Sequence, residues 1–291
     1  MRWLCVACAA CGVPPASPRP HAGQAQLSSA ADARMIAIPE GRYIAGSTPE
    51  ERATAYDDYL ASSGNDTARE RDWFGKEADR HIATLPAFRI DLMPVTQVEY
   101  AEFVTQAQAT APSIDEAQWR AQGFQQNYDT QVARFVWHDD RPPIGREDHP
   151  VVLVTQADAA RYCAWRGGEV GQPRRLPTSD EYEKAARGVT GLVYPWGNSY
   201  EPSKLNSAVQ GPGDTTSVGA YVAGGSPFGV LELAGNVFEW TSTAAPHEPG
   251  ENTVKGSAWE DFAGVGRGAS GHGRPPRARH VIVGFRCASD G

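Results

Sequence analysis

Residues 228–242 combine glycine, asparagine and two carboxylates with large apolar residues, a mixture that suits neither a regular helix nor a regular strand. The glycines indicate backbone conformations that other residues rarely adopt, and the polar residues indicate a site. A second block, residues 254–261, begins like a strand and leads into the glycine-rich residues 264–273, which we expect to be too flexible for the core. Together the blocks predict a loop-rich scaffold that presents a pocket.

The composition agrees with a chain of short elements joined by turns. It contains 30 glycines, 22 prolines and 8 tryptophans, which favour many turns fixed by aromatic side chains over long helices. An apolar content of 41% is sufficient for a core. The net charge of -8 and the absence of a basic stripe exclude a nucleic-acid partner. No apolar run is long enough to predict a transmembrane helix.

The N-terminus reads as a targeting segment followed by a linker. Residues 1–13 are predicted to be a short signal or lipoprotein leader, and residues 14–34, rich in Pro, Ala, Ser and Gln, a disordered tether. Cys8 and Cys11 each follow a small residue, as a lipid-anchored cysteine does, although neither has a leucine three positions earlier. The alternative is a mis-assigned start or an unstructured leader. We expect a periplasmic or otherwise extracytoplasmic protein whose one folded domain spans residues 35–291.

Two further cysteines, Cys163 and Cys287, lie far apart in the sequence. In an exported protein such a pair is most simply a disulfide that closes a long loop. In a cytoplasmic protein the two residues would instead be separate buried thiols.

Two helices are predicted to begin at capping boxes. Thr155 precedes one helix, with Asp158 three residues later, and Thr178 precedes another, with Glu181 in the same relation. The second helix is expected to end near residues 187–188. Apolar spacing predicts two earlier helices, at residues 50–60 and 97–106.

Short apolar or alternating segments predict strands. They lie at residues 35–41, 42–46, 87–91 and 149–154. Residues 111–148 are polar and irregular, and we expect them to form a long insertion over the core surface, where such loops often shape binding sites.

Several motifs, in this order, resemble those of the formylglycine-generating enzyme (sulfatase-modifying factor) family: residues 149–152, 160–165, 175–188, 194–197, 235–241 and 284–287. The resemblance extends over residues 35–288. It implies an α+β fold related to the C-type lectin fold, with little regular secondary structure. It also implies a disulfide between Cys163 and Cys287, which strengthens the expectation of export.

The chain departs from the family pattern at the family's reactive centre. Formylglycine-generating enzymes carry two cysteines, five residues apart, that bind copper after a Gly-Gly-Ser-like strand. Depending on register, the first position here is Glu260 or Asp261, and the second is Val265 or Gly266. These residues lack the soft thiolates that Cu(I) prefers, so we expect no copper.

The resemblance implies two calcium sites. In the first, the family ligand positions correspond to Glu232, Gly235, Val237 and Glu239. Carboxylate and carbonyl oxygens suit this hard cation. The alternative is that Glu239 accepts hydrogen bonds from buried backbone N–H groups. In the second site, Asn206 and the carbonyl of Ser207 are candidate ligands.

Trp259, Glu260 and Asp261 are the candidate catalytic residues. A carboxylate beside a tryptophan in a cleft has a raised pKa and can act as a general acid or base. Some family branches without the cysteine pair still support oxidative chemistry, including the pyoverdine-maturation branch, which acts on a peptide-derived siderophore chromophore precursor. The alternative is that the polar side chains only hold a turn.

Two functions follow from these expectations. One is oxidative maturation of a peptide or peptide-derived metabolite, with Glu260 as acid or base. The other is a non-catalytic module that binds a peptide or glycan in the lectin-like pocket.

A basic rim is expected near the glycine-rich segment, and it comprises Arg267, Arg274, Arg277, Arg279 and His280. These side chains are expected to steer an acidic substrate, and the alternative is that they form a solvated face.

Overall fold

The computed structural model describes residues 35–124 and 126–291. The predicted leader and tether, with Cys8 and Cys11, lie outside the described residues. Among residues 35–124 and 126–291, none of the helices combines the length and the hydropathy of a membrane-spanning segment.

Three small sheets carry the strands. The largest has the order β7-β6-β5-β8 and joins β5 (Phe238–Ala244), β6 (Asn252–Gly256), β7 (Gly271–Arg274) and β8 (Val283–Gly284). Only the β5–β8 pairing in it is parallel. The second sheet has the order β1-β4-β9 and joins β1 (Met35–Ile38), β4 (Phe88–Asp91) and β9 (Ala288–Asp290), while β2 (Gly41–Ala45) pairs with β3 (His81–Leu85). The first two strands therefore turn away from each other into different sheets.

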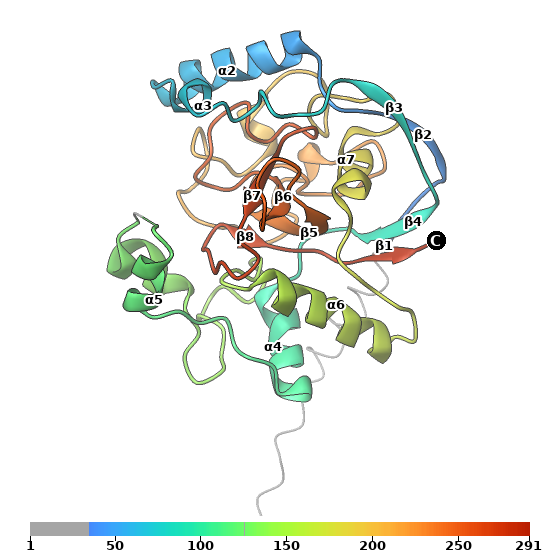
Figure 1. Ribbon diagram of the computed structural model, residues 1–291. Helices are drawn as coiled ribbons and strands as arrows, with labels where there is room; N and C mark the ends of the chain where they lie inside the picture. The colour runs from blue at the N-terminus through green and yellow to red at the C-terminus, as the bar shows by residue number, and fades with distance from the viewer. Residues whose placement is uncertain (1–34, 125) are drawn as a thin grey trace, which may run out of the picture.

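Helices lie on opposite sides of the four-stranded sheet (Figure 1). On one side are α2 (Pro49–Ser63) and α3 (Thr67–Glu70), and on the other are α4 (Gln97–Ala107) and α6 (Gln156–Glu169). The remaining longer helix, α7 (Ser179–Arg187), packs against β2, β5 and β6. The combination of short strands, short helices and long connections confirms the predicted α+β class.

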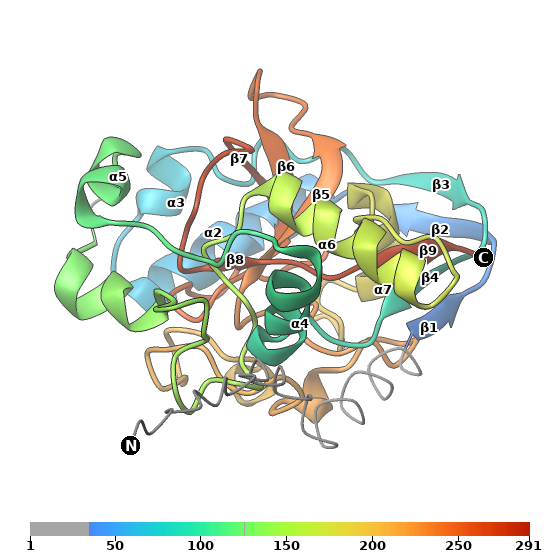
Figure 2. The same cartoon turned by 90° about the horizontal axis from the view of Figure 1, so that it is seen from below.

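The expected insertion of residues 111–148 folds into α5 (Glu116–Ala121), η1 (Tyr128–Val132) and η2 (Ala133–Phe135). Figure 2 shows α5 at one side of the molecule. The indole Nε1 of Trp119 donates to the carbonyl of Gln126 at 3.1 Å, which anchors the insertion internally. Two further short turns, η3 (Pro202–Lys204) and η4 (Val222–Gly224), lie in the long connection before β5.

The capping boxes in the sequence correctly predicted where two of the helices begin. The hydroxyl of Thr155 accepts from the backbone N–H of Asp158 at 3.1 Å, and that of Thr178 accepts from the N–H of Glu181 at 3.1 Å. Each acidic side chain returns a bond to the backbone N–H of its N-cap residue, as a capping box requires.

The strand predicted at residues 149–154 is wrong, although residues 150–154 are buried. The N–H of Val151 donates to Val95 and that of Leu153 to His280, so the segment bonds to two different loops and forms no ladder. Leu153 also has a φ of 61°, a left-handed conformation that interrupts an extended strand.

The expectation that residues 264–273 are too flexible for the core is also wrong, since most of them are buried. A Cβ atom at Gly264 would overlap the carbonyl of Ala55, and one at Gly268 would overlap the side chain of Arg187. The glycines therefore permit close packing here, and they do not indicate a loose segment.

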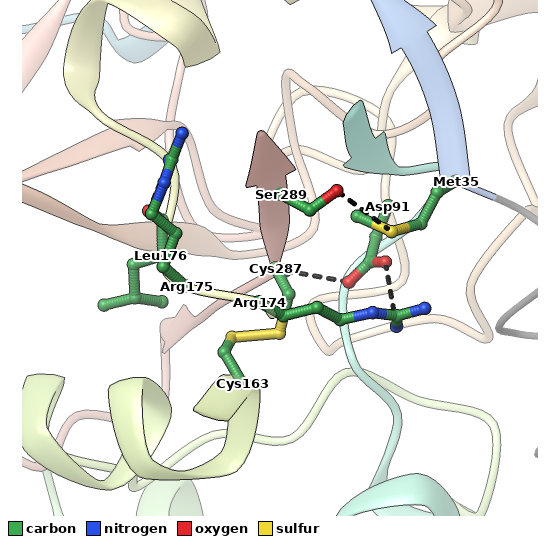
Figure 3. The surroundings of a disulfide bond; sticks show 8 residues. All are labelled: Met35, Asp91, Cys163, Arg174, Arg175, Leu176, Cys287 and Ser289. Carbon is green, nitrogen blue, oxygen red and sulfur yellow. Dashed lines mark hydrogen bonds and ion pairs between the residues drawn. A yellow bond between two sulfur atoms is a disulfide. The ribbon is translucent and has the colours of Figure 1, made fainter. Parts of the chain in front are cut away.

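The disulfide between Cys163 and Cys287 is present and joins α6 to the segment before β9. Figure 3 shows Asp91 beside it, with one carboxylate oxygen accepting the backbone N–H of Cys287 at 2.8 Å. Arg174 faces the same carboxylate, 3.8 Å from its other oxygen. The bond closes a loop of 124 residues around the core.

Candidate functional site

The glycine- and asparagine-rich block forms a buried turn centred on Asn236. Glu232 and Asn236 both have left-handed φ angles, 55° and 67°, and Gly235 lies between them with a φ of 84°. The Asn236 amide donates to the carbonyl of Thr216 at 3.1 Å and to a carboxylate oxygen of Glu232 at 3.2 Å. Its Oδ1 accepts the Thr216 N–H at 3.0 Å. Asn236 thus joins this turn to the earlier segment of the chain that contains Thr216.

Glu239 forms an ion pair at the centre of the protein. Both it and Arg286 are completely buried, and the guanidinium donates to its two carboxylate oxygens at 2.6 and 2.7 Å. The Tyr182 hydroxyl adds a third donor at 3.3 Å. Burial raises the pKa of Glu239, and Arg286 opposes that rise. The carboxylate is therefore satisfied by side chains and not by the backbone N–H groups considered as an alternative.

Glu232 is the second carboxylate of the first predicted calcium site. It accepts the Gly219 N–H at 2.7 Å as well as the Asn236 amide, and burial raises its pKa to about 7. The carbonyl of Gly235 accepts the Val237 N–H at 2.9 Å. Because these oxygens already receive donors, this set fits a cation less well than its residue types suggested. Within residues 35–124 and 126–291, no three His, Cys, Asp or Glu side chains form a metal-binding group.

The second predicted calcium site has an oxygen without a partner. The Asn206 amide nitrogen donates to the Asp214 carbonyl at 2.8 Å and to Asn236 Oδ1 at 3.1 Å, which fixes the orientation of the side chain. Its Oδ1 is buried and accepts no hydrogen bond from any described residue. A Cβ at residue 211 would overlap this oxygen and lie 2.5 Å from the Ser207 carbonyl, so Gly211 leaves a space beside both. The Ser207 carbonyl accepts the Gly211 N–H at 2.7 Å, so the unpartnered oxygen of Asn206 is the feature that favours a hard cation here.

Trp259 is buried beneath the insertion. Its ring stacks on Phe135 with centroids 6.4 Å apart, and the Arg134 guanidinium lies 5.5 Å from the ring centroid. The indole Nε1 is buried and has no hydrogen-bond partner among the described residues. Within the described residues the tryptophan is therefore held by ring contacts and not by a hydrogen bond.

The two neighbouring carboxylates differ in their surroundings. Asp261 accepts the Ala258 N–H at 2.7 Å, while its own N–H donates to the Ala258 carbonyl at 3.0 Å. This side chain closes a turn, as the alternative interpretation had it. Burial raises its pKa to about 7. Its role in the turn leaves Glu260 as the less constrained carboxylate.

Glu260 is half-buried and weakly bonded. Its side-chain hydrogen bond comes from the amide of Gln126 at 3.4 Å, near the upper limit for such a bond. Burial raises the pKa of Glu260, with Gln126 and nearby Arg274 opposing the rise. Sequence reasoning did not identify Gln126, and its only signal was a position inside the irregular insertion.

The prediction of a solvent-facing basic rim is wrong for three of its five residues. Arg267 is buried against Glu77, and Arg279 donates to Asp158 at 2.7 Å. His280 is buried beside aromatic rings, and burial lowers its pKa to about 3, so it is neutral. Arg274 and Arg277 remain at the lining of an open cavity of about 500 Å³.

The positions expected for the family's second cysteine are also buried. Val265 is 1% exposed, and a Cβ at Gly266 would lie 2.8 Å from the Ser257 hydroxyl. A cysteine would therefore need local rearrangement at Gly266, whereas Val265 already holds a branched side chain at its position.

Comparison with known proteins identifies the family. Residues 23–291 match the model of the "Sulfatase-modifying factor enzyme 1-like domain". The chain belongs to this family. It is 32% identical to "Inactive C-alpha-formylglycine-generating enzyme 2" of Mus musculus, over 91% of this chain and 88% of that protein.

Two further comparisons concern a curated relative and a solved structure. "Hercynine oxygenase" of Mycolicibacterium smegmatis is 29% identical over 78% of this chain and 58% of that protein. The solved structure of PvdO from Pseudomonas aeruginosa matches with a TM-score of 0.65 at 21% identity, over 88% of this chain and 94% of that one. At this identity the structural match supports the fold, and the predicted formylglycine-generating-enzyme fold is confirmed.

Proposed function

We propose that this family member carries out oxidative maturation of a peptide or peptide-derived metabolite, such as a siderophore chromophore, without copper, and that Glu260 transfers the proton. The observation that carries the proposal is the contrast between adjacent carboxylates. Asp261 is committed to a turn, whereas Glu260 keeps a half-buried carboxylate with one long hydrogen bond from the described residues. A partly desolvated carboxylate with a free lone pair is suited to general acid–base chemistry. The similarity to a protein named hercynine oxygenase agrees with oxidative chemistry.

In this reaction a C–H or N–H bond of the substrate breaks, and Glu260 takes the proton. The substrate loses two electrons and two protons in total. Dioxygen, as the external acceptor, takes up the two electrons and two protons and becomes hydrogen peroxide. Trp259 lies next to Glu260 in the chain and stacks on Phe135, and the Gln126 amide donates a long hydrogen bond to the Glu260 carboxylate.

Glu260→Gln keeps the size of the side chain and removes its basicity. We expect product formation per folded protein to fall by about 10²-fold, the lower end for loss of a general base. Because Glu260 must be ionised to accept a proton, wild-type activity should decline as the pH falls through its raised pKa. Mass spectrometry of producing cells, with a deletion strain to identify the product, measures both effects. Unchanged product in cells carrying the variant would exclude Glu260 as the base.

The alternative function is a non-catalytic binding module. It is favoured by the similarity over nearly the whole chain to a protein named an inactive formylglycine-generating enzyme. In that case a peptide or glycan would occupy the surface around Trp259 without being altered. Wild-type and deletion strains would then contain the same mature products, and only ligand binding would depend on the protein.

We also propose that the protein works outside the cytoplasm, anchored by Cys8 or Cys11. The disulfide supports this location because such bonds persist in oxidising compartments. Labelling with a palmitate analogue, followed by Cys8→Ser and Cys11→Ser substitutions, tests the anchor.

We propose that Asn206 and Ser207 hold a structural calcium ion. The orphaned Asn206 oxygen supports this, and Gly211→Ala should fill the space beside it. At a calcium concentration 100-fold above Kd, calcium should stabilise the wild type by about 2.7 kcal/mol and the variant by much less. Gly168→Ala is the control, because a Cβ there meets no atom within 4 Å. The unfolding temperature of each protein is measured with calcium and with EDTA. An equal rise of the unfolding temperature by calcium in Gly211→Ala and Gly168→Ala would contradict the site.

A further inference from the structure

A cavity of about 280 Å³ lies away from Glu260 and contains a buried lysine. Its floor is formed by Thr253 and Lys255 of β6 and by Gly271 and Gly273 of β7. Its walls come from the start of α7, the loop after α3 and the β5–β6 connection. The proposed reaction at Glu260 does not use this cavity.

Lys255 is 2% exposed and has few partners for its three N–H donors. Its Nζ donates to the Ala269 carbonyl at 3.2 Å, and the carboxylate nearest to it in an ion pair, that of Glu183, is 3.8 Å away. Lys184 provides a comparison, because its buried Nζ donates to the Pro39 carbonyl at 2.6 Å and the Gly41 carbonyl at 3.2 Å. Lys184 is therefore satisfied by the fold, whereas Lys255 borders an open space.

Glu183 is oriented so that one oxygen is held and the other is available. Its Oε1 accepts the Gly46 N–H at 2.8 Å and an Arg187 N–H at 2.6 Å. Its Oε2 accepts no hydrogen bond from the described residues and faces Lys255 at 3.8 Å. Both Glu183 and Lys255 line the cavity. An amine, a carboxylate beside it and groups that orient the carboxylate are the components of an activated nucleophile.

We propose that Lys255 is a covalent binding site for a small aldehyde, with Glu183 as the proton-transfer group. The ammonium of Lys255 gives a proton to Glu183 Oε2, and the neutral amine attacks the carbonyl carbon to form a carbinolamine. Glu183 returns the proton to the carbinolamine hydroxyl, water leaves, and a protonated imine forms, with Glu183 again a carboxylate. No electrons are gained or lost overall. Burial lowers the pKa of Lys255, which favours the nucleophilic neutral amine.

The lining favours an aldehyde without negative charge, because it carries five acidic side chains, Asp72, Glu77, Asp180, Glu183 and Glu248, against the three basic ones, Arg71, Lys76 and Lys255. Trp73 supplies an aromatic surface, and Asp180 is an exposed wall carboxylate that forms no ion pair with any described residue. An anionic aldehyde would meet this charge and that of Glu183, whereas a neutral one would not. The proposal is independent of Glu260.

Reductive trapping tests the proposal, because the chain contains only four lysines, Lys76, Lys184, Lys204 and Lys255. The full chain is incubated with butanal and cyanoborohydride at neutral pH, and the modified lysine is located by peptide mass mapping. We expect the adduct at Lys255 to exceed that at exposed Lys76 by about tenfold, as an activated amine should. Glyoxylate, the anionic probe, should label Lys255 several-fold less than butanal under the same conditions.

Two variants complete the test. Lys255→Arg should lose the dominant adduct, and Lys76→Arg, which alters an exposed lysine of the same cavity, should retain it. If Lys255→Arg does not fold, the peptide mass map of the labelled wild-type protein still shows whether Lys255 is the most strongly modified lysine. Labelling of Lys76 or Lys204 equal to or above that of Lys255 would overturn the proposal, as would an unlabelled Lys255.

Discussion

Replacing Arg286 with methionine is expected to lower the free energy of unfolding by about 3–5 kcal/mol, or to prevent folding. The guanidinium is completely buried and bonds both oxygens of Glu239. It also donates to four backbone carbonyls, those of residues 91, 92, 231 and 232. The substitution leaves the Glu239 carboxylate as a buried charge without its cation, and burying an unpaired charge is costly.

Arg120→Met provides the matched control in urea unfolding. Arg120 pairs with Glu116 at 2.6 Å on the surface of α5, and its side chain is 73% exposed. Such surface pairs contribute about 0–1 kcal/mol. Pairing Arg286→Met with Glu239→Leu should restore part of the lost stability, because the double variant removes both charges. Similar effects for Arg286→Met and Arg120→Met would contradict the central role of the buried pair.

Removing the disulfide is expected to destabilise the protein by about 2–5 kcal/mol. Cys163 and Cys287 are separated by 124 residues, so the bond restricts a large part of the unfolded chain. The double variant Cys163→Ser/Cys287→Ser leaves two small polar side chains in the core. Thermal unfolding of this variant measures the loss.

Reduction of the wild type by dithiothreitol is the control for this prediction. It should lower the unfolding temperature of the wild type and have no effect on the double variant. A reduced wild type as stable as the oxidised protein would show that the disulfide is unimportant for stability.

Local chemistry in the sequence predicted much of the fold. Thr155 and Thr178 marked helix starts because a capping box involves residues only three positions apart. The glycine-rich block at 235–236 was correctly associated with unusual backbone angles. The family motifs then gave the pairing of Cys163 and Cys287, which composition alone had left open.

Features that depend on distant residues were not predictable in this way. The Gly264 backbone packs against Ala55, which lies more than 200 residues earlier, so its burial has no local signal. Glu239 resembled a metal ligand by residue type, but its buried partner Arg286 is 47 positions away. The opening of Lys255 toward a cavity likewise depends on α7 and the loop after α3.

The most direct test of the proposed function compares Glu260→Gln with Asp261→Asn in the same product-forming assay, each normalised to folded protein. We predict that the Glu260 variant loses product formation by about 10²-fold with little loss of stability. The Asp261 variant should lose stability, because it weakens the turn at Ala258, and should keep its activity per folded molecule. Full activity of Glu260→Gln, or a greater loss in Asp261→Asn, would contradict the assignment of Glu260 as the reactive carboxylate.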